Sequence, residues 1–138
     1  MIVVLDTNIL VVSLTSMSPY HKIFTALKNN RFILAVSTEI LMEYQEIISD
    51  KYSVRAAHEF LNLLSELPNV LFTTVYYNWQ LIQADKEDNK FVDCAIAAAA
   101  DYLVTEDSHF NILRQLDFPK VNLADINAFQ ISFHKIVP

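Results

Sequence analysis

The chain has 138 residues, of which 53% are hydrophobic and 19% charged, and its formal net charge is −6. That length and apolar content predict one folded domain spanning residues 1–138 rather than a disordered chain. The acidic balance is not that of a protein that coats nucleic acid, and the absence of glycine excludes P-loop and dinucleotide-binding folds, which need glycine-rich phosphate loops.

The sequence also bears on the cellular compartment. Cys94 is the single cysteine, so the chain forms no intramolecular disulfide and does not need an oxidising compartment. The N-terminus lacks the basic segment of a secretory signal, and Asp6 and Asn8 interrupt its apolar run well short of a membrane span. We therefore expect a soluble cytoplasmic protein.

Strand-like and helix-like patterns alternate along the chain. In chain order they predict a strand at 2–5, a helix at 18–29, a strand at 32–36, helices at 38–48 and 54–67, a strand at 70–75, a short helix at 79–84, a helix at 89–100, a strand at 102–105, a helix at 108–115, a strand at 121–123 and a last helix from Asp125 to about Phe133. Ser18-Pro19 is typical of a helix start, and Ser37 or Thr38 would cap the helix that follows the second strand.

The alternation favours a mostly parallel sheet covered on both faces, a three-layer α/β/α domain. Sites in such sheets lie beyond the carboxyl ends of the strands, where the strand order reverses. Asp6 follows the first strand and Asp107 follows the fourth. If these two strands are neighbours, the two carboxylates meet.

A third acid comes from the helix at 38–48, which carries Glu39, Glu43 and Glu46. On a helical wheel its apolar residues form one arc, and Glu43 lies nearest to it, roughly 40° from Ile47. Glu43 is therefore the acid of this helix that would point toward a cleft. The alternative is an ordinary solvated acidic face.

A fourth acid, Asp93, lies in the segment "NKFVDCAIAAAA", which is apolar nearly all round and should be buried. It shares a face with apolar Ile96 and Ala100, so its carboxylate must be protonated, paired with a cation or bound to a metal. The alternative is a buried aspartate bonded to a backbone amide or to Lys90.

The neighbours of these acids have simpler interpretations. Asp107 could merely cap the next helix, while Thr105 and Asn8, each two residues from an aspartate, could hold its carboxylate by hydrogen bonding. Asp85, Glu87 and Asp88 resemble an acidic loop in which Asp88 is a helix cap. The histidines show no paired ligand spacing, which argues against zinc, and Cys94 is interpreted as a core residue.

The acids at positions 6, 43, 93 and 107 fit one explanation. Crowded carboxylates raise one another's pKa, and a hard divalent cation such as Mg²⁺ or Mn²⁺ removes that penalty. A site of this kind suits phosphodiester hydrolysis by a metal-activated water, which needs no nucleophilic side chain. The sequence offers no credible Ser/His/Asp or Cys/His arrangement.

In order and spacing these motifs resemble the PIN-domain ribonucleases, particularly the toxins of bacterial toxin–antitoxin pairs. "VLDTNIL" resembles the family's first block, "STEILMEYQEII" its second, and "DNKFVDCAIAAAADYLVTEDSHF" its third and fourth. The resemblance covers Met1 to about Phe129. It implies that Asp6, Glu43, Asp93 and Asp107 are the catalytic and metal-binding acids.

The resemblance further implies a sheet of about five strands in the order 3-2-1-4-5, Mg²⁺- or Mn²⁺-dependent RNA cleavage, a homodimer and a neutralising antitoxin whose segment occupies the groove. The sequence departs from the family pattern at Glu106, where relatives often have glycine, and at His109, where some carry an acid. Asp88 could also join the metal shell instead of Asp93 or beside it.

Two competing functions are weighed against the nuclease. The first is a catalytically inactive PIN-like module that binds RNA or protein through a few cations, such as Lys22, Lys86 and Lys90; Lys86 and Lys90 are also candidate substrate contacts for the nuclease. The second, a phosphotransfer receiver domain, is disfavoured because the strand at 70–75 ends in "TTVYYN" without an acid. Phe60, Leu64 and Trp79 could serve dimerisation, although core burial is the simpler interpretation of each.

Overall fold

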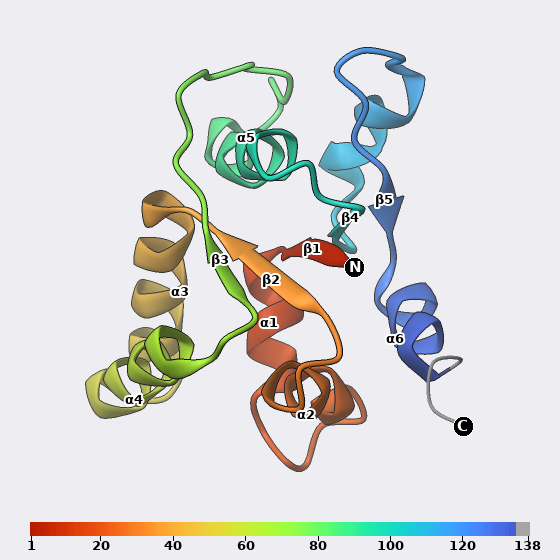
Figure 1. Cartoon of the computed structure of the whole chain (residues 1–138). Helices are drawn as coiled ribbons and strands as arrows, with labels where there is room; N and C mark the ends of the chain where they lie inside the picture. The colour runs from red at the N-terminus through yellow and green to blue at the C-terminus, as the bar shows by residue number, and fades with distance from the viewer. Residues whose placement is uncertain (135–138) are drawn as a thin grey trace.

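The structure is a computed structural model that describes residues 1–134 of the chain. The predicted domain extends to Pro138, and its last four residues lie outside the described part. The elements in chain order are β1 (Ile2–Leu5), α1 (Thr7–Ser13), α2 (His21–Lys28), β2 (Ile33–Val36), α3 (Thr38–Lys51), α4 (Val54–Glu66), β3 (Val70–Phe72), the 3₁₀ helix η1 (Lys86–Asp88), α5 (Asn89–Ala97), β4 (Tyr102–Val104), the 3₁₀ helix η2 (Ser108–Gln115), β5 (Leu123–Ala124) and α6 (Ile126–His134) (Figure 1).

The five strands form one parallel sheet in the order β3-β2-β1-β4-β5, which confirms the predicted topology. The first strand is therefore central, and its neighbours are the second and the fourth. Leu5 pairs with Val104, so β1 and β4 end level with each other. The residues that follow these two strands consequently emerge at the same edge of the sheet.

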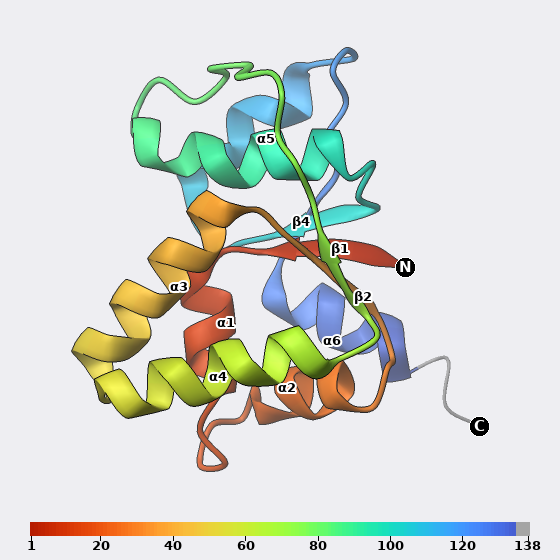
Figure 2. The same ribbon diagram turned by 60° about the vertical axis from the view of Figure 1, so that its left-hand side comes forward.

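Helices cover both faces of the sheet, as the three-layer prediction requires. Figure 2 shows α5 on one side and α1, α2 and α6 on the other. The long helices α3 and α4 pack against each other, and α3 also contacts α1 and α5. The central strand β1 is buried over most of its length, since Val3, Val4 and Leu5 expose no surface. Within residues 1–134, no helix combines the length and apolar character needed to cross a bilayer.

Helix α1 was not predicted from the sequence. Most of its residues are buried, the polar Thr7 and Ser13 among them, so the segment shows no polar stripe that would reveal a helical period. The helix begins at once after β1 because the backbone carbonyl of Asp6 accepts hydrogen bonds from the N–H groups of Ile9 and Leu10. The Asp6 side chain is left free of capping and available for the site.

The short helix predicted at 79–84 is wrong, because residues 73–84 carry no helix or strand. This irregular segment is held by hydrogen bonds to α5 instead. The N–H of Trp79 donates to Asp93, and the Asn89 side chain bonds both the N–H and the carbonyl of Ile82, at 2.8 and 3.0 Å. Side-chain contacts with α5 thus replace local helical hydrogen bonds.

Several boundaries also differ from the prediction. Helix α2 begins at His21 because the Ser18 hydroxyl accepts the Tyr20 N–H in a turn before it, and β3 ends at Phe72 rather than at 75. Helix α5 ends at Ala97, since Ala99 adopts a left-handed φ of 50° that breaks the helix.

The helix caps predicted at Ser37 and Asp125 are confirmed, and the one predicted at Asp88 is wrong. Ser37 accepts the Ile40 N–H, and Asp125 accepts the Ala128 N–H at 2.7 Å, as expected. The cap prediction for Asp88 is wrong, because its side chain makes no capping hydrogen bond and Asp85 accepts the Glu87 N–H instead. Cys94, Phe60 and Leu64 lie in the core, and Trp79 is half-buried.

Candidate metal centre

Asp6 lies at the centre of the site, directly after β1. Its backbone N–H donates to the carbonyl of Val104 at 3.0 Å, which extends the pairing of β1 with β4 by one residue. This register sets the Thr105 hydroxyl beside Asp6, where it donates to Oδ2 at 2.8 Å. Asp6 is 7% exposed, so the chain holds a carboxylate in a largely buried position.

Burial raises the pKa of the Asp6 carboxyl. The hydrogen bonds from the Thr105 hydroxyl and the Thr7 backbone N–H oppose this, whereas the charges of Glu43 and Asp107 raise the pKa further. The charges of Glu43 and Asp107 thus act on Asp6, and the shared role of these acids as metal ligands stays a prediction. All three belong to different segments, which only the tertiary structure brings together.

Glu43 lies on α3, and both of its carboxylate oxygens accept a hydrogen bond. The Thr7 hydroxyl at the start of α1 donates to Oε2, and the Lys90 ammonium on α5 lies 2.8 Å from Oε1. Lys90 also lies 3.0 Å from Oε2 of Glu87, and its side chain is only 10% exposed. Thr7 was not identified from the sequence, because its contact with Glu43 spans 36 positions.

Asp107 follows β4 and caps the 3₁₀ helix η2. Its backbone N–H donates to the Thr105 hydroxyl at 3.0 Å, and its Oδ1 accepts the His109 N–H at 2.9 Å. The two interpretations of this residue, as a cap and as a site acid, are therefore both compatible with its position. One carboxylate oxygen serves the cap, while the charge acts on Asp6.

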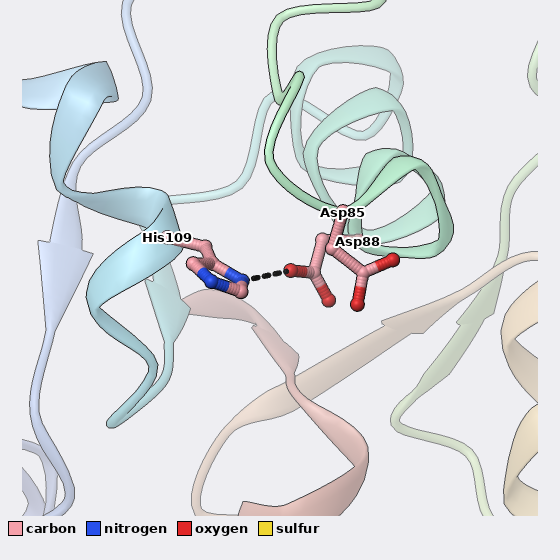
Figure 3. A group of neighbouring side chains, drawn as sticks. All are labelled: Asp85, Asp88 and His109. Atoms are coloured by element: carbon pink, nitrogen blue, oxygen red, sulfur yellow. Dashed lines mark hydrogen bonds and ion pairs between the residues drawn. The ribbon is translucent and has the colours of Figure 1, made fainter.

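Asp88 also belongs to this group. Figure 3 shows its carboxylate between Asp85 and the imidazole of His109, and its Oδ2 lies 3.4 Å from Nδ1 of His109. Burial and the charge of Asp85 raise the pKa of Asp88 to about 6, with additional contributions from Asp107 and Asp6, while the hydrogen bond to His109 lowers it. Asp88 thus lies within the electrostatic influence of Asp107 and Asp6, and the alternative in which it joins the metal shell stays a prediction.

Asp93 has different surroundings from the other predicted acids. It is 5% exposed, and its Oδ1 accepts the backbone N–H of Trp79 at 3.1 Å. Burial raises its pKa, the Trp79 hydrogen bond lowers it, and the acid that raises it further is Glu39, one helical turn before Glu43. Asp93 therefore follows the alternative of a buried aspartate bonded to a backbone amide. Its predicted catalytic role stays a prediction.

Of the remaining predicted site residues, some contact the acids and others are exposed to solvent. Thr105 makes the expected contact with Asp6, whereas Asn8 is exposed on α1. Lys86 is exposed on η1, and Lys90 is paired with Glu43 and Glu87.

The sequence spacing did not reveal the acidic neighbours of His109. Asp85 and Asp88 lie more than twenty positions before it in the chain and approach it only in the folded structure.

The donors present fit a hard divalent cation. Asp6, Glu43, Asp88 and Asp107 offer carboxylate oxygens, the ligands that Mg²⁺ and Mn²⁺ prefer. Asp85, Asp88 and His109 each offer one ligand atom, and these three atoms lie within 4.8 Å of one another. A cation bound to this group would offset the repulsion between the carboxylates of Asp85 and Asp88.

Comparison with known proteins agrees with this geometry. A PIN domain family model matches residues 2–109, while no match was found among curated proteins. Two solved structures share the fold. One is VapBC2 from Rickettsia felis bound to a DNA fragment from its promoter, with a TM-score of 0.62 and 19% identity over 91% of this chain and 98% of that one.

The other is VapBC-1 from nontypeable Haemophilus influenzae, with a TM-score of 0.56 and 20% identity over 92% of this chain and 99% of that one. At these identities the two structures show the similarity of the fold alone. The family model, in contrast, matches most of the sequence itself, from β1 to the start of η2. The chain therefore belongs to the PIN domain family.

Proposed function

We propose that this PIN domain is a metal-dependent endoribonuclease that hydrolyses RNA phosphodiester bonds in the cytoplasm, as the toxin of a toxin–antitoxin pair. The observation that carries the proposal is the buried Asp6 carboxylate, which lies in the field of Glu43 and Asp107 at the carboxyl ends of β1 and β4. Family membership and the fold shared with VapBC proteins support the same conclusion.

Asp6, Asp107, Asp88 and Glu43 are the residues proposed to hold Mg²⁺ or Mn²⁺. Such an ion supplies a bound water of lowered pKa and charge stabilisation at the phosphate. The chain's own residues fix the ligands beforehand, since Thr105 orients Asp6, and Thr7 with Lys90 orients Glu43. Lys86, exposed on η1, is the proposed phosphate contact.

The test is cleavage of a mixed-sequence RNA by purified protein with Mg²⁺ or Mn²⁺, compared with the Asp6→Asn variant. Asparagine retains an oxygen that accepts the Thr105 hydrogen bond but loses the charge, so cleavage should fall at least about a hundredfold while the fold persists. Asp50→Asn, on the exposed end of α3, is the matched control and should cleave normally. Unchanged cleavage by Asp6→Asn would exclude the role proposed for Asp6.

The alternative function is an inactive module that binds RNA or protein. It is favoured by the Lys90 ammonium beside Glu43, because a side-chain cation within the acid group reduces the need for a metal. Calorimetry with Mn²⁺ separates the two functions. An inactive module would bind RNA without turnover, with no Mn²⁺ affinity or with metal binding that supports no cleavage.

The partner proposals have their own tests. A cognate antitoxin should be encoded in a neighbouring reading frame, co-purify with this chain and suppress its RNA cleavage. We also propose a homodimer, which light scattering of the purified protein would detect. Phe60 and Leu64 cannot form its interface as they stand, because both side chains are buried in the core.

A further inference from the structure

A polar cleft lies next to the proposed catalytic acids, and the proposed reaction uses only Lys86 and Lys90 of its lining. Two adjoining cavities, of about 300 and 600 Å³, share the lining residues Glu39, Asn78, Lys90 and Asp93. We call this the Asp93 cleft. Its volume suits a small ligand such as one nucleotide.

Asp93 is the unusual member of this lining. It is a carboxylate that is 95% buried, and only its Oδ1 accepts a hydrogen bond from residues 1–134, the one from Trp79. The charged group that acts on its pKa is Glu39, which has the same sign and raises it. The cation in the lining, Lys90, is already bound to Glu43 and Glu87. Within residues 1–134, two carboxylates that form no ion pair with a cation therefore line the same cleft.

Other side chains extend the recognition surface. The larger cavity is lined by the amides of Asn78, Gln80 and Gln83 and by the ammonium of Lys86, all of them exposed. Side-chain amides and carboxylates read the edges of bases, and lysine contacts phosphate. Asn89 has another task, since its amide holds the segment in place through Ile82.

We infer that the Asp93 cleft binds a guanine nucleotide, with Asp93 and Glu39 accepting hydrogen bonds from the N1–H and N2–H₂ groups of the base. Guanine presents two adjacent donors on its Watson–Crick edge. Adenine and cytosine set an acceptor beside the amino group, and uracil flanks its N–H with two acceptors, so each would turn lone pairs toward a carboxylate. Splayed single-stranded RNA exposes this edge.

The position of the cleft indicates where in the substrate the guanine would lie. Glu39 stands one helical turn before Glu43 on α3, and Lys90 both lines the cleft and binds Glu43. A bound base would thus belong to a nucleotide adjoining the cut bond. Naming RNA as the source of the guanine rests on the proposed function, whereas the preference for guanine in the cleft does not.

The first experiment measures binding without catalysis. Trp79 is the single tryptophan and its backbone N–H donates to Asp93, so its fluorescence should report occupancy of the cleft. Guanosine 5′-monophosphate, inosine 5′-monophosphate and adenosine 5′-monophosphate are titrated into the Asp6→Asn protein. We expect the Kd for the guanine nucleotide to be about tenfold lower than for the other two. Inosine lacks the N2 amino group, and adenine sets an acceptor beside its amino group.

Asp93→Asn, added to this background, should abolish the tenfold difference while its Oδ1 retains the Trp79 hydrogen bond. Glu39→Gln, at an exposed position, should reduce the difference, and Asp50→Asn should leave it intact. Equal Kd values for the three nucleotides in the Asp6→Asn protein, or an unchanged difference in both cleft variants, would overturn the inference.

The second experiment identifies the source of the guanine. The wild-type protein with Mn²⁺ is given RNA oligonucleotides that differ only in guanine, inosine or adenine beside the cut site. Faster cleavage at guanine, by about tenfold, supports RNA as the source. Tight guanosine monophosphate binding without any cleavage preference overturns that assignment in favour of a free nucleotide. If no RNA is cut, the proposed function fails, and the fluorescence titration still decides the cleft.

Discussion

The ammonium nitrogen of Lys90 lies 2.8 Å from Oε1 of Glu43, so a side-chain cation shares the acidic site with any metal ion that binds there. Burial lowers the pKa of Lys90, but the hydrogen bonds to Glu43 and Glu87 outweigh it and raise the pKa overall. The lysine is therefore charged at neutral pH, and it both stabilises Glu43 and repels a divalent ion.

Replacing Lys90 by methionine should reveal both effects. In metal-free buffer the free energy of unfolding should fall by about 1–3 kcal/mol, because Glu43 keeps its partly buried position without its charged partner. Saturating Mn²⁺ should recover part of this loss, and the Mn²⁺ affinity should rise because a positive charge has been removed. Urea unfolding and calorimetry measure the two quantities.

The control for this change is Lys86→Met, which removes an exposed ammonium from η1, four positions before Lys90. Its unfolding free energy should stay close to that of the wild type, as is usual for exposed charges. An equal loss of stability in both variants would show that the Lys90–Glu43 ion pair has no special role.

The stability of the metal-free protein should depend on pH through Asp88. Its pKa is about 6 in the folded protein and 3.8 as an ordinary aspartate, so the folded state holds more protons between these values. Stability must then fall as the pH rises from about 4 through 6, and the raised pKa of Asp6 acts in the same direction. In EDTA, the urea midpoint should be higher near pH 5 than near pH 7.5.

Asp88→Asn should flatten part of this pH dependence and leave the contribution of Asp6. Mn²⁺ should raise the midpoint near pH 7.5, where the acids are ionised and the ion offsets their repulsion. A metal-free midpoint that increases from pH 5 to pH 7.5 would contradict the electrostatic description of the site.

The sequence predicted the sheet and the two acids at its edge because both depend on local patterns. Short buried runs mark β1 and β4, and an aspartate directly after each of them falls where parallel strands end. Once the strand order is known, Asp6 and Asp107 must lie close together. Helix α1 was not predicted because most of its residues are buried, so it has no polar face that would reveal its period.

The burial of Asp93 was also predictable, since its helix is apolar around it, but its partners were not. Which cleft a buried side chain faces depends on the rotation of α5 against the sheet and on the path of residues 73–84. Both are fixed by long-range contacts such as Asn89 with Ile82 and Asp93 with Trp79. The grouping of Asp85, Asp88 and His109 has the same tertiary origin.

Cys94 should be chemically inert in the native protein. Burial raises the pKa of its thiol to about 12, with a further increase from Asp93 and a decrease from its hydrogen bond with Thr73, and its side chain is fully buried. The reactive thiolate is therefore scarce and inaccessible at neutral pH. Ellman's reagent should react with one thiol per chain in urea and with none in native buffer; rapid native labelling would contradict this position.

His109 should distinguish Mn²⁺ from Mg²⁺. Its imidazole shares a potential ligand group with Asp85 and Asp88, and nitrogen ligands suit transition metals better than Mg²⁺, which favours oxygen. His109→Ala should therefore weaken Mn²⁺ binding by about tenfold and change Mg²⁺ binding little. Calorimetry with each ion near pH 7.5 gives the comparison, and His58→Ala, at an exposed position on α4, is the matched control. Equal losses for both ions would mean that His109 acts only by positioning Asp88, and no loss would place the ion among the carboxylates of Asp6, Glu43 and Asp107.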